Sequence, residues 1–259
     1  MSYETLKFEI FDKIAVITID HPKVNALNSK VISELDKAVD EIESNKNVRV
    51  FVITGAGNKF FVAGADIKEF ENKNAFEGRT FVRNLQLVFR KISNSKKPSI
   101  CAINGFALGG GMELALACDI RYASENAKMG QPEINLGIIP GAGGTQILSR
   151  LVGKAKAKEM IFSGKHISAS EAFEIQLIQK LTNQESLLEE TMALAKEISK
   201  KSPIMLSYAK ELIDRGYEID LENAISWEAD KFGLCFSTED KQEGIKAFFE
   251  KREPEFKGL

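Results

Sequence analysis

Residues 99–145 read SICAINGFALGGGMELALACDIRYASENAKMGQPEINLGIIPGAGGT and contain the densest cluster of glycines in the chain. The short apolar run 99–103 is typical of a buried strand. Gly109, Gly110 and Gly111 stand directly before the helix-forming segment MELALACDI, so we expect a strand to turn into a helix here. The start of that helix suits a phosphate, or an oxygen that gains negative charge during a reaction. A tight turn with nothing bound is the alternative. Nucleotide motifs fit poorly, because neither GK[ST] nor the GxGxxG spacing is present.

The same stretch places two glutamates in apolar surroundings. Glu113 lies in the first turn of the expected helix, where the helix dipole favours a carboxylate. Glu133 follows in GQPEINLG, again beside hydrophobic residues. Two carboxylates in one dry pocket repel each other and lose hydration, which raises at least one pKa and suits one as acid and one as base. The alternative is that Glu113 only caps a helix and that Glu133 faces solvent from a loop.

The motifs NGFALGGGMELALACDIRYAS and MGQPEINLGIIPGAGGTQ, together with the upstream FFVAGADIKEF, resemble the enoyl-CoA hydratase (crotonase) family. The resemblance extends from AVITIDHPKVNALN to FSTEDKQEGIKAFFEKR, so it covers essentially the whole chain. It implies an α/β fold, the crotonase-like spiral of repeated β-β-α units with a helical C-terminal domain. It also implies a lyase of fatty acid and lipid metabolism. Such an enzyme adds water reversibly, by syn addition, to a trans-2-enoyl-CoA, and the likeness to short-chain hydratases favours crotonyl-CoA.

The resemblance also assigns roles to residues. The backbone N–H groups of Ala65 and Gly110 would hold the thioester oxygen in an oxyanion hole. Glu113 would act as base toward the water, and Glu133 would deliver a proton to Cα. The residues that the resemblance places beside the acyl-CoA are Ala26, Leu27, Ala63, Ala65, Asp66, Ile67, Lys68, Gly110, Gly141, Phe248 and Lys251. Phe248 and Lys251 would reach the adenine of coenzyme A on a neighbouring subunit. No metal is implied, and no cofactor other than the coenzyme A that forms part of the substrate.

Composition and charge are those of an ordinary soluble globular protein. The 259 residues are 44% hydrophobic and 28% charged, and the net charge of −2 gives no general attraction to nucleic acid or to an anionic membrane. The first residues, MSYETLKFEIFDK, resemble neither a signal peptide nor a transit peptide, and no apolar run approaches membrane-spanning length. We therefore expect a cytoplasmic protein with neither a membrane nor a nucleic-acid partner.

Cysteines and histidines argue for catalysis by carboxylates. Cys101, Cys118 and Cys235 are scattered and lack CxxC spacing, so free thiols are expected, with those in apolar runs buried. His21 and His166 are the only histidines, and neither lies in a recognisable site motif. A histidine-based triad or a zinc site therefore does not fit the sequence, and any catalysis must rest on carboxylates and backbone dipoles.

The segments before the glycine cluster follow the periodicity of alternating strands and helices. Residues 5–19 predict two strands joined by a turn at Asp12-Lys13. Residues 29–45 predict a helix with Ser29 as its cap, and residues 48–54 a strand covered on both faces. Asp66 is expected to open a further helical segment.

The segments after the glycine cluster are mostly helical. Residues 154–163 and 168–175 predict helices, and LIQKLTN predicts a short return strand. Helices follow from about residue 185, with a break at Pro203. We expect a spiral core over residues 1–198 and a helical oligomerisation region over residues 199–259. The resemblance implies homotrimers, or homohexamers made as dimers of trimers.

Two other functions remain open at this stage. A Δ3-Δ2-enoyl-CoA isomerase of the same family could work with a single glutamate. A non-catalytic RNA-binding protein on the same fold is the alternative from another class, because Arg79, Arg83, Arg90, Lys91, Lys96 and Lys97 give residues 72–97 a basic character. Their interleaving with Phe, Leu, Val and Ile is more typical of an amphipathic helix with a solvated face.

Overall fold

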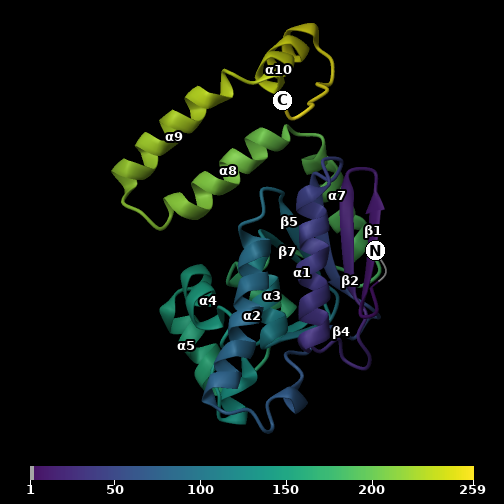
Figure 1. Cartoon of the computed structure of the whole chain (residues 1–259), viewed down its shortest axis with the longest axis vertical. Coiled ribbons are helices and arrows are strands. Elements are labelled where there is room, and N and C mark those ends of the chain that lie inside the picture. Colours follow the sequence, from purple (N-terminus) through teal and green to yellow (C-terminus); the bar gives the residue numbers. More distant parts are fainter. Residues whose placement is uncertain (1–2) are drawn as a thin grey trace.

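The computed structural model of the protein describes residues 3–259. These residues form two sheets, and the chain passes repeatedly from one sheet to the other. The larger sheet has, in spatial order, β1 (Leu6–Phe11), β2 (Ile14–Ile19), β3 (Val50–Gly55), β5 (Ser99–Ile103), β7 (Ile120–Ser124) and β10 (Lys180–Thr182). The smaller sheet has β4 (Phe60–Val62), β6 (Phe106–Leu108), β8 (Lys128–Gly130) and β9 (Ile167–Ser168). Figure 1 shows these sheets with helices around them.

Within residues 3–259, seven helices accompany the strands of this core. They are α1 (Ser29–Ser44), α2 (Ala75–Ser93), α3 (Gly110–Ala117), α4 (Gly144–Val152), α5 (Lys154–Ser163), α6 (Ala169–Glu174) and α7 (Leu187–Ser199). Two short 3-10 helices, η1 (Ile67–Glu69) and η2 (Pro132–Leu136), lie in the connections. None of the helices formed by residues 3–259 combines the length and the apolar composition needed to cross a bilayer.

The order of these elements is the expected spiral. Strands β3, β5 and β7 are parallel neighbours in the larger sheet, and each is followed by β4, β6 or β8, which are parallel neighbours in the smaller sheet. Helices α2, α3 and α4 complete the three units. The predicted crotonase fold with repeated β-β-α units is therefore confirmed.

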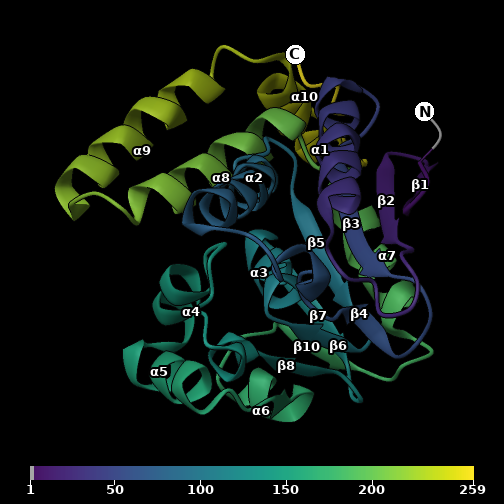
Figure 2. The same ribbon diagram turned by 60° about the horizontal axis from the view of Figure 1, so that its bottom comes forward.

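The central strands β3 and β5 of the larger sheet are buried on both faces. Side chains alternate along a strand, so Val50 and Val52 face one side of β3 while Phe51 and Ile53 face the other. The first pair packs with residues of α7, and the second pair belongs to the main core beneath α1, α2 and α3. Figure 2 shows the sheet between these helices. Burial on both faces explains why the strands are continuous apolar runs.

One predicted helix cap is wrong by a residue, although the helix itself begins at Ser29 as expected. The cap of α1 is Asn28, whose side-chain oxygen accepts a hydrogen bond of 2.9 Å from the N–H of Val31. Ser29 is the first helical residue, and its hydroxyl donates to Glu69 across 2.7 Å. Both residue types favour caps, so only the backbone conformation distinguishes them.

The other predicted helices are present, with some differences at their ends: α3 begins at Gly110, within the glycine cluster, and ends at Ala117, before the predicted segment does. The two strands around Asp12 form β1 and β2, and Asp66 caps η1. Helix α5 has the predicted bounds, and Ser168 caps α6 with its hydroxyl. Pro203 occupies the first turn of the next helix, where a missing N–H costs nothing.

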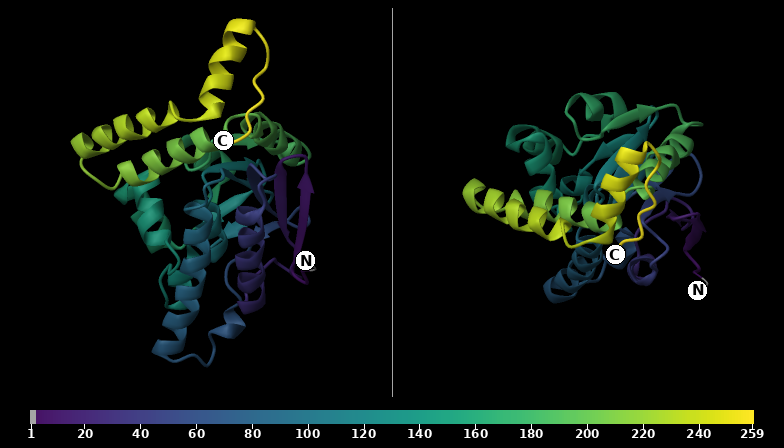
Figure 3. Two further views of the ribbon diagram at one scale, coloured as in Figure 1. Left: turned by 45° about the horizontal axis from the view of Figure 1, so that its top comes forward. Right: turned by 90° about the horizontal axis from the view of Figure 1, so that it is seen from above.

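Three C-terminal helices extend away from the sheets (Figures 1 and 3). They are α8 (Pro203–Gly216), α9 (Leu221–Cys235) and α10 (Glu239–Glu250). Helix α9 runs back beside α8, and neither has a fully buried residue within this chain. The predicted boundary between residues 198 and 199 falls at the end of α7, and the separate role of the region beyond it remains a prediction.

Candidate active site

The glycine cluster turns β6 into α3 against the backbone of a neighbouring strand. Gly109 has φ +52° and ψ −123°, which a residue with a side chain rarely adopts. A Cβ on Gly111 would lie 2.0 Å from the carbonyl oxygen of Val62 in β4, so only glycine fits there. The cluster therefore brings the start of α3 directly beside the end of β4.

Two backbone N–H groups are left without partners at this junction. Leu27 donates to the carbonyl of Gly64 across 2.8 Å and accepts from the N–H of Asp66 across 2.9 Å. These two hydrogen bonds use the carbonyl of Gly64 and the N–H of Asp66, which lie on either side of Ala65. The N–H of Ala65 itself is left free. Within residues 3–259, neither Ala65 nor Gly110 donates its N–H to a protein acceptor. A Cβ on Gly110 would lie 3.6 Å from the nitrogen of Ala65, so the two donors are neighbours.

Glu113 is buried, and its carboxylate is held by the turn that leads into α4. It lies in the first turn of α3, as expected, with 3% of its surface exposed. Its Oε1 accepts hydrogen bonds from the N–H groups of Ala142 (2.7 Å) and Gly144 (2.8 Å) at the start of α4. Burial raises the pKa of Glu113, and these two hydrogen bonds oppose that rise. The carboxylate is thus fixed in position and its charged form is partly stabilised.

Glu133 lies on the other side of the glycine cluster, in the first turn of η2. Its Oε1 lies 2.9 Å from the point that a Cβ on Gly109 would occupy. Burial raises the pKa of Glu133 to about 7, and the negative charge of Glu113 adds to that rise. The two glutamates therefore interact electrostatically, and Glu133 is poised to change protonation near neutral pH.

Gln131 orients Glu133, a contact that the sequence reasoning missed. With its amide nitrogen turned toward Glu133, Gln131 donates to the two carboxylate oxygens across 3.0 and 3.2 Å. Gln131 is completely buried. The sequence offered one signal of this contact. Gln131 lies two residues before Glu133 in the GQPE motif, and a buried amide needs a polar partner.

The two glutamates and the two free N–H groups open onto one cavity of about 720 Å³. This volume includes space that is open to solvent, and the walls are largely apolar, as they are in most small-molecule sites. The lining residues are Ala63, Gly64, Ala65, Ile67, Phe70, Phe81, Val82, Leu85, Gly109, Gly110, Glu113, Pro132, Glu133, Leu136, Ile138, Ile139, Gly141 and Ala142. An apolar group could lie along α2 while a carbonyl oxygen reaches Ala65 and Gly110.

Four other predicted binding residues line the cavity or lie directly behind its wall. Ala63, Ile67 and Gly141 line the cavity. Leu27 is buried behind Gly110, with its Cδ1 3.3 Å from the position of a Cβ there.

Several predicted binding residues lie outside that lining. Ala26 lies in the loop before Leu27, Asp66 uses its side chain to accept from the N–H of Lys68 (3.1 Å), and Lys68 is exposed. Phe248 is exposed on α10, and Lys251 follows that helix, at the end of the molecule away from α4 and α5 (Figure 1). The roles of these residues toward coenzyme A stay predictions.

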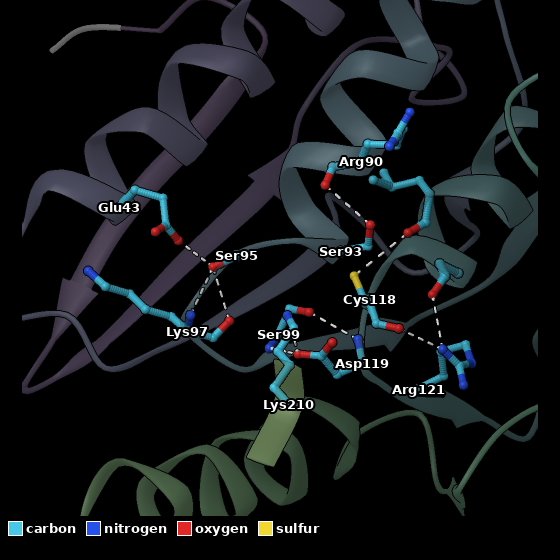
Figure 4. Close-up of polar contacts among 12 residues, drawn as sticks. Glu43, Arg90, Ser93, Ser95, Lys97, Ser99, Cys118, Asp119, Arg121 and Lys210 are labelled. Carbon is cyan, nitrogen blue, oxygen red and sulfur yellow. Dashed lines mark hydrogen bonds and ion pairs between the residues drawn. The ribbon is translucent and has the colours of Figure 1, made fainter. Parts of the chain in front are cut away.

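A polar network anchors the far end of α3. Figure 4 shows Asp119 between Ser99 and Lys210. Its carboxylate accepts from the N–H of Ser99 and from Nζ of Lys210, each across 2.8 Å. The buried Arg121 donates to the carbonyl of Cys118 across 2.7 Å. Cys101 and Cys118 are buried free thiols, as expected. The network fixes the helix whose first turn carries Glu113.

The basic segment 72–97 has the amphipathic form that the sequence favours. Helix α2 buries Phe81, Leu85 and Val88 on one face. Lys91 forms ion pairs with Asp36 and Asp40 of α1, so part of the positive charge is neutralised within the chain. No group of three or more His, Cys, Asp or Glu side chains in the described part of the chain is arranged to hold a metal ion.

Comparisons with known proteins identify relatives of this chain. The family model described as enoyl-CoA hydratase/isomerase matches residues 9–259. The chain is 48% identical over 244 residues to the short-chain-enoyl-CoA hydratase of Clostridium acetobutylicum, covering 94% of each chain. It is 47% identical over 257 residues to the crotonyl-CoA hydratase of Syntrophomonas wolfei, covering 99% of each. The crystal structure of an enoyl-CoA hydratase from Bacillus anthracis superposes with a TM-score of 0.96 at 38% identity, covering 99% of this chain and 100% of that one.

Proposed function

The chain belongs to the enoyl-CoA hydratase/isomerase family, and we propose that it adds water reversibly to a short-chain trans-2-enoyl-CoA such as crotonyl-CoA. The observation that carries the proposal is the convergence of two glutamates and two free backbone N–H groups on one apolar cavity. The names of the two relatives at 47–48% identity support hydration and a short acyl group.

The free N–H groups would stabilise the thioester oxygen. As the oxygen of water bonds to C3 of the substrate, the electron pair of the double bond moves toward the carbonyl oxygen. The N–H groups of Ala65 and Gly110 would hydrogen-bond to the negative charge that develops there. Such a donor is typically worth about 10²–10³ in rate.

The glutamates would divide the two proton transfers. Glu113, whose charged form accepts two backbone hydrogen bonds, would take a proton from water. Glu133, with a pKa raised to about 7, is protonated in a large fraction of molecules at neutral pH and would deliver its proton to Cα. Exchange of one proton with solvent then restores both groups. Each transfer is worth roughly 10²–10⁴ in rate.

The test follows the ultraviolet absorbance of crotonyl-CoA, which is lost when its conjugated double bond is hydrated. We expect rapid loss with the wild type and a decrease in kcat of about 10²–10⁴ for Glu113→Gln and for Glu133→Gln. Glu125→Gln, which alters an exposed carboxylate outside the cavity, is the matched control and should retain full activity.

A 3-enoyl-CoA separates hydration from isomerisation. If the wild type converts the 3-enoyl-CoA but not crotonyl-CoA, and Glu113→Gln retains that activity, the protein is an isomerase rather than a hydratase. If the wild type leaves both thioesters unchanged, the proposal is wrong.

A further inference from the structure

His21 belongs to a loop outside the cavity, yet both of its ring nitrogens are engaged. Nδ1 lies 2.9 Å from the carbonyl oxygen of Ala26, and Nε2 lies 3.3 Å from the side-chain nitrogen of Asn28. A carbonyl oxygen only accepts, so Nδ1 must carry a proton. The side-chain oxygen of Asn28 is used by the N–H of Val31, which turns its nitrogen toward His21. Nε2 is therefore the acceptor, and the neutral Nδ1–H tautomer satisfies both contacts.

The loop that His21 closes has a conformation that needs support. Asn25 has φ +54°, which is uncommon for a residue other than glycine. Its N–H donates to the carbonyl of His21, and its side chain accepts from the N–H of His21. The same side chain donates to the carbonyls of Ala56 and Phe60, so the loop is tied to the core at one end. The hydrogen bond from His21 to Ala26 fixes the peptide that directly precedes Leu27.

Leu27 connects this loop to the oxyanion donors. Its backbone makes the two hydrogen bonds that flank Ala65, and its side chain packs against Gly110. A shift of the peptide between Ala26 and Leu27 would therefore move the N–H of Ala65 relative to that of Gly110. Donors of this kind act only when they are held within about 0.5 Å of the productive geometry.

We propose that His21 is a positioning residue, whose Nδ1–H holds the Ala26–Leu27 peptide and thereby places the N–H of Ala65 in the oxyanion hole. The inference rests on the proposed hydratase function. His21 touches neither the cavity nor the reacting atoms, so its effect passes through Leu27. Loss of this hydrogen bond should weaken stabilisation of the transition state more than binding of the thioester.

The variants His21→Asn and His21→Gln distinguish the roles of the two ring nitrogens. His21→Asn places an amide nitrogen where Nδ1 was, so it can still donate to Ala26. His21→Gln places an amide oxygen where Nε2 was, so it can accept from Asn28 but lacks the donor to Ala26. We expect His21→Asn to remain close to wild type in kcat. His21→Gln should lose about 10- to 100-fold in kcat with little change in KM, since misplacement by about 1 Å costs about 10²-fold.

A chromophoric ligand reports the oxyanion hole directly. The absorbance of 4-(dimethylamino)cinnamoyl-CoA moves to longer wavelength when hydrogen bonds polarise its thioester carbonyl. We expect the full shift with the wild type and His21→Asn, and a smaller shift with saturated His21→Gln. Ser168→Ala removes the cap of α6, away from the cavity, and serves as a stability control. It should lower the melting temperature without changing kcat or the absorbance shift.

The outcomes separate the inference from the function on which it rests. If the wild type is active and His21→Gln keeps the wild-type kcat and absorbance shift, the positioning role is wrong. The role is also wrong if both His21 variants lose melting temperature alone, as Ser168→Ala does. A wild type that neither hydrates crotonyl-CoA nor shifts the probe would overturn the proposed function and the positioning role together.

Discussion

Glu133 is the residue whose chemistry depends most on its surroundings. Burial, with the charge of Glu113, raises its pKa to about 7, so the pair holds a single proton below that pH. The proposed mechanism needs that proton, and kcat/KM for hydration should therefore fall about tenfold per pH unit above pH 7. Hydration neither takes up nor releases a net proton, so dehydration must show the same decline. Rates measured in both directions from pH 5 to 9 check this, and the residual activity of Glu133→Gln should lack the decline.

The same pKa predicts how stability depends on pH. The ordinary pKa of glutamate is 4.5, and the folded value here is about 7, so the folded state binds the proton more tightly than the unfolded state. The favourable contribution is complete below pH 4.5 and is lost as pH rises through 7. Glutamine carries no charge at any pH. The melting temperature of Glu133→Gln should therefore rise relative to wild type between pH 5 and pH 8, and a constant difference would contradict the burial of this carboxyl group.

The sequence predicted the two glutamates but not the groups that hold them. Glu113 was placed in the first turn of a helix because glycines and an apolar run identify that turn. The N–H groups of Ala142 and Gly144, which hold it, come from a turn about thirty residues later. Gln131 is near Glu133 in sequence, but its side-chain direction depends on burial. Local patterns identify the reactive residues, whereas their supporting contacts arise from packing between distant segments.

At the scale of elements, α2 and the turn before α4 narrow the cavity. A Cβ on Gly141 would lie 3.0 and 3.1 Å from the two methyl groups of Val82, and both residues line the cavity. If the acyl chain lies along α2, Gly141→Ala should lower kcat/KM for trans-2-octenoyl-CoA at least about tenfold more than for crotonyl-CoA. The double variant Val82→Ala/Gly141→Ala should recover the longer substrate. Gly78→Ala is the matched control, because nothing lies within 4 Å of its added Cβ.

Element types were more predictable than their ends. The strands β3 and β5 were recognisable because sheets covered on both faces have continuous apolar strands. The spiral itself followed from the resemblance, since no repeat is visible in the sequence. The wrong cap at Ser29 shows the limit, because Asn28 and Ser29 are equally good caps by residue type and only the backbone conformation of the folded chain distinguishes them.

At the scale of the molecule, the C-terminal helices are joined to the core by few contacts. Lys210 of α8 forms its ion pair with Asp119 (2.8 Å), and Arg49 of the core donates to the carbonyl of Phe256 near the C-terminus (Figure 4 shows the first). Helix α9 packs on α8, where Lys231 bonds to Glu211 across 2.7 Å. The rest of α9 has no partner within residues 3–259, so its outer surface is available to another subunit.

That surface of α9 carries an apolar stripe. Leu221, Ile225 and Phe232 fall on one face of the helix, and their exposures are 73%, 57% and 66%. Large exposed apolar side chains in a row mark a protein interface. We therefore expect this stripe to be buried in the homotrimer, alone or paired as a hexamer, that the resemblance to the family implies.

Light scattering coupled to size-exclusion chromatography tests whether this stripe forms a subunit interface. The variants place arginine either in the stripe or on another face of the same helix. Ile225→Arg with Phe232→Arg should convert the oligomer to monomers, because each buried arginine would lack a carboxylate partner. Ser226→Arg adds a charge to a different face of the same helix and should leave the mass unchanged.

Phe248 and Lys251 are predicted to reach a neighbouring subunit's coenzyme A, so the monomer should also show a raised KM for crotonyl-CoA. A monomeric wild type would contradict the predicted assembly, and an unchanged KM in the dissociated variant would remove these two residues from the substrate site.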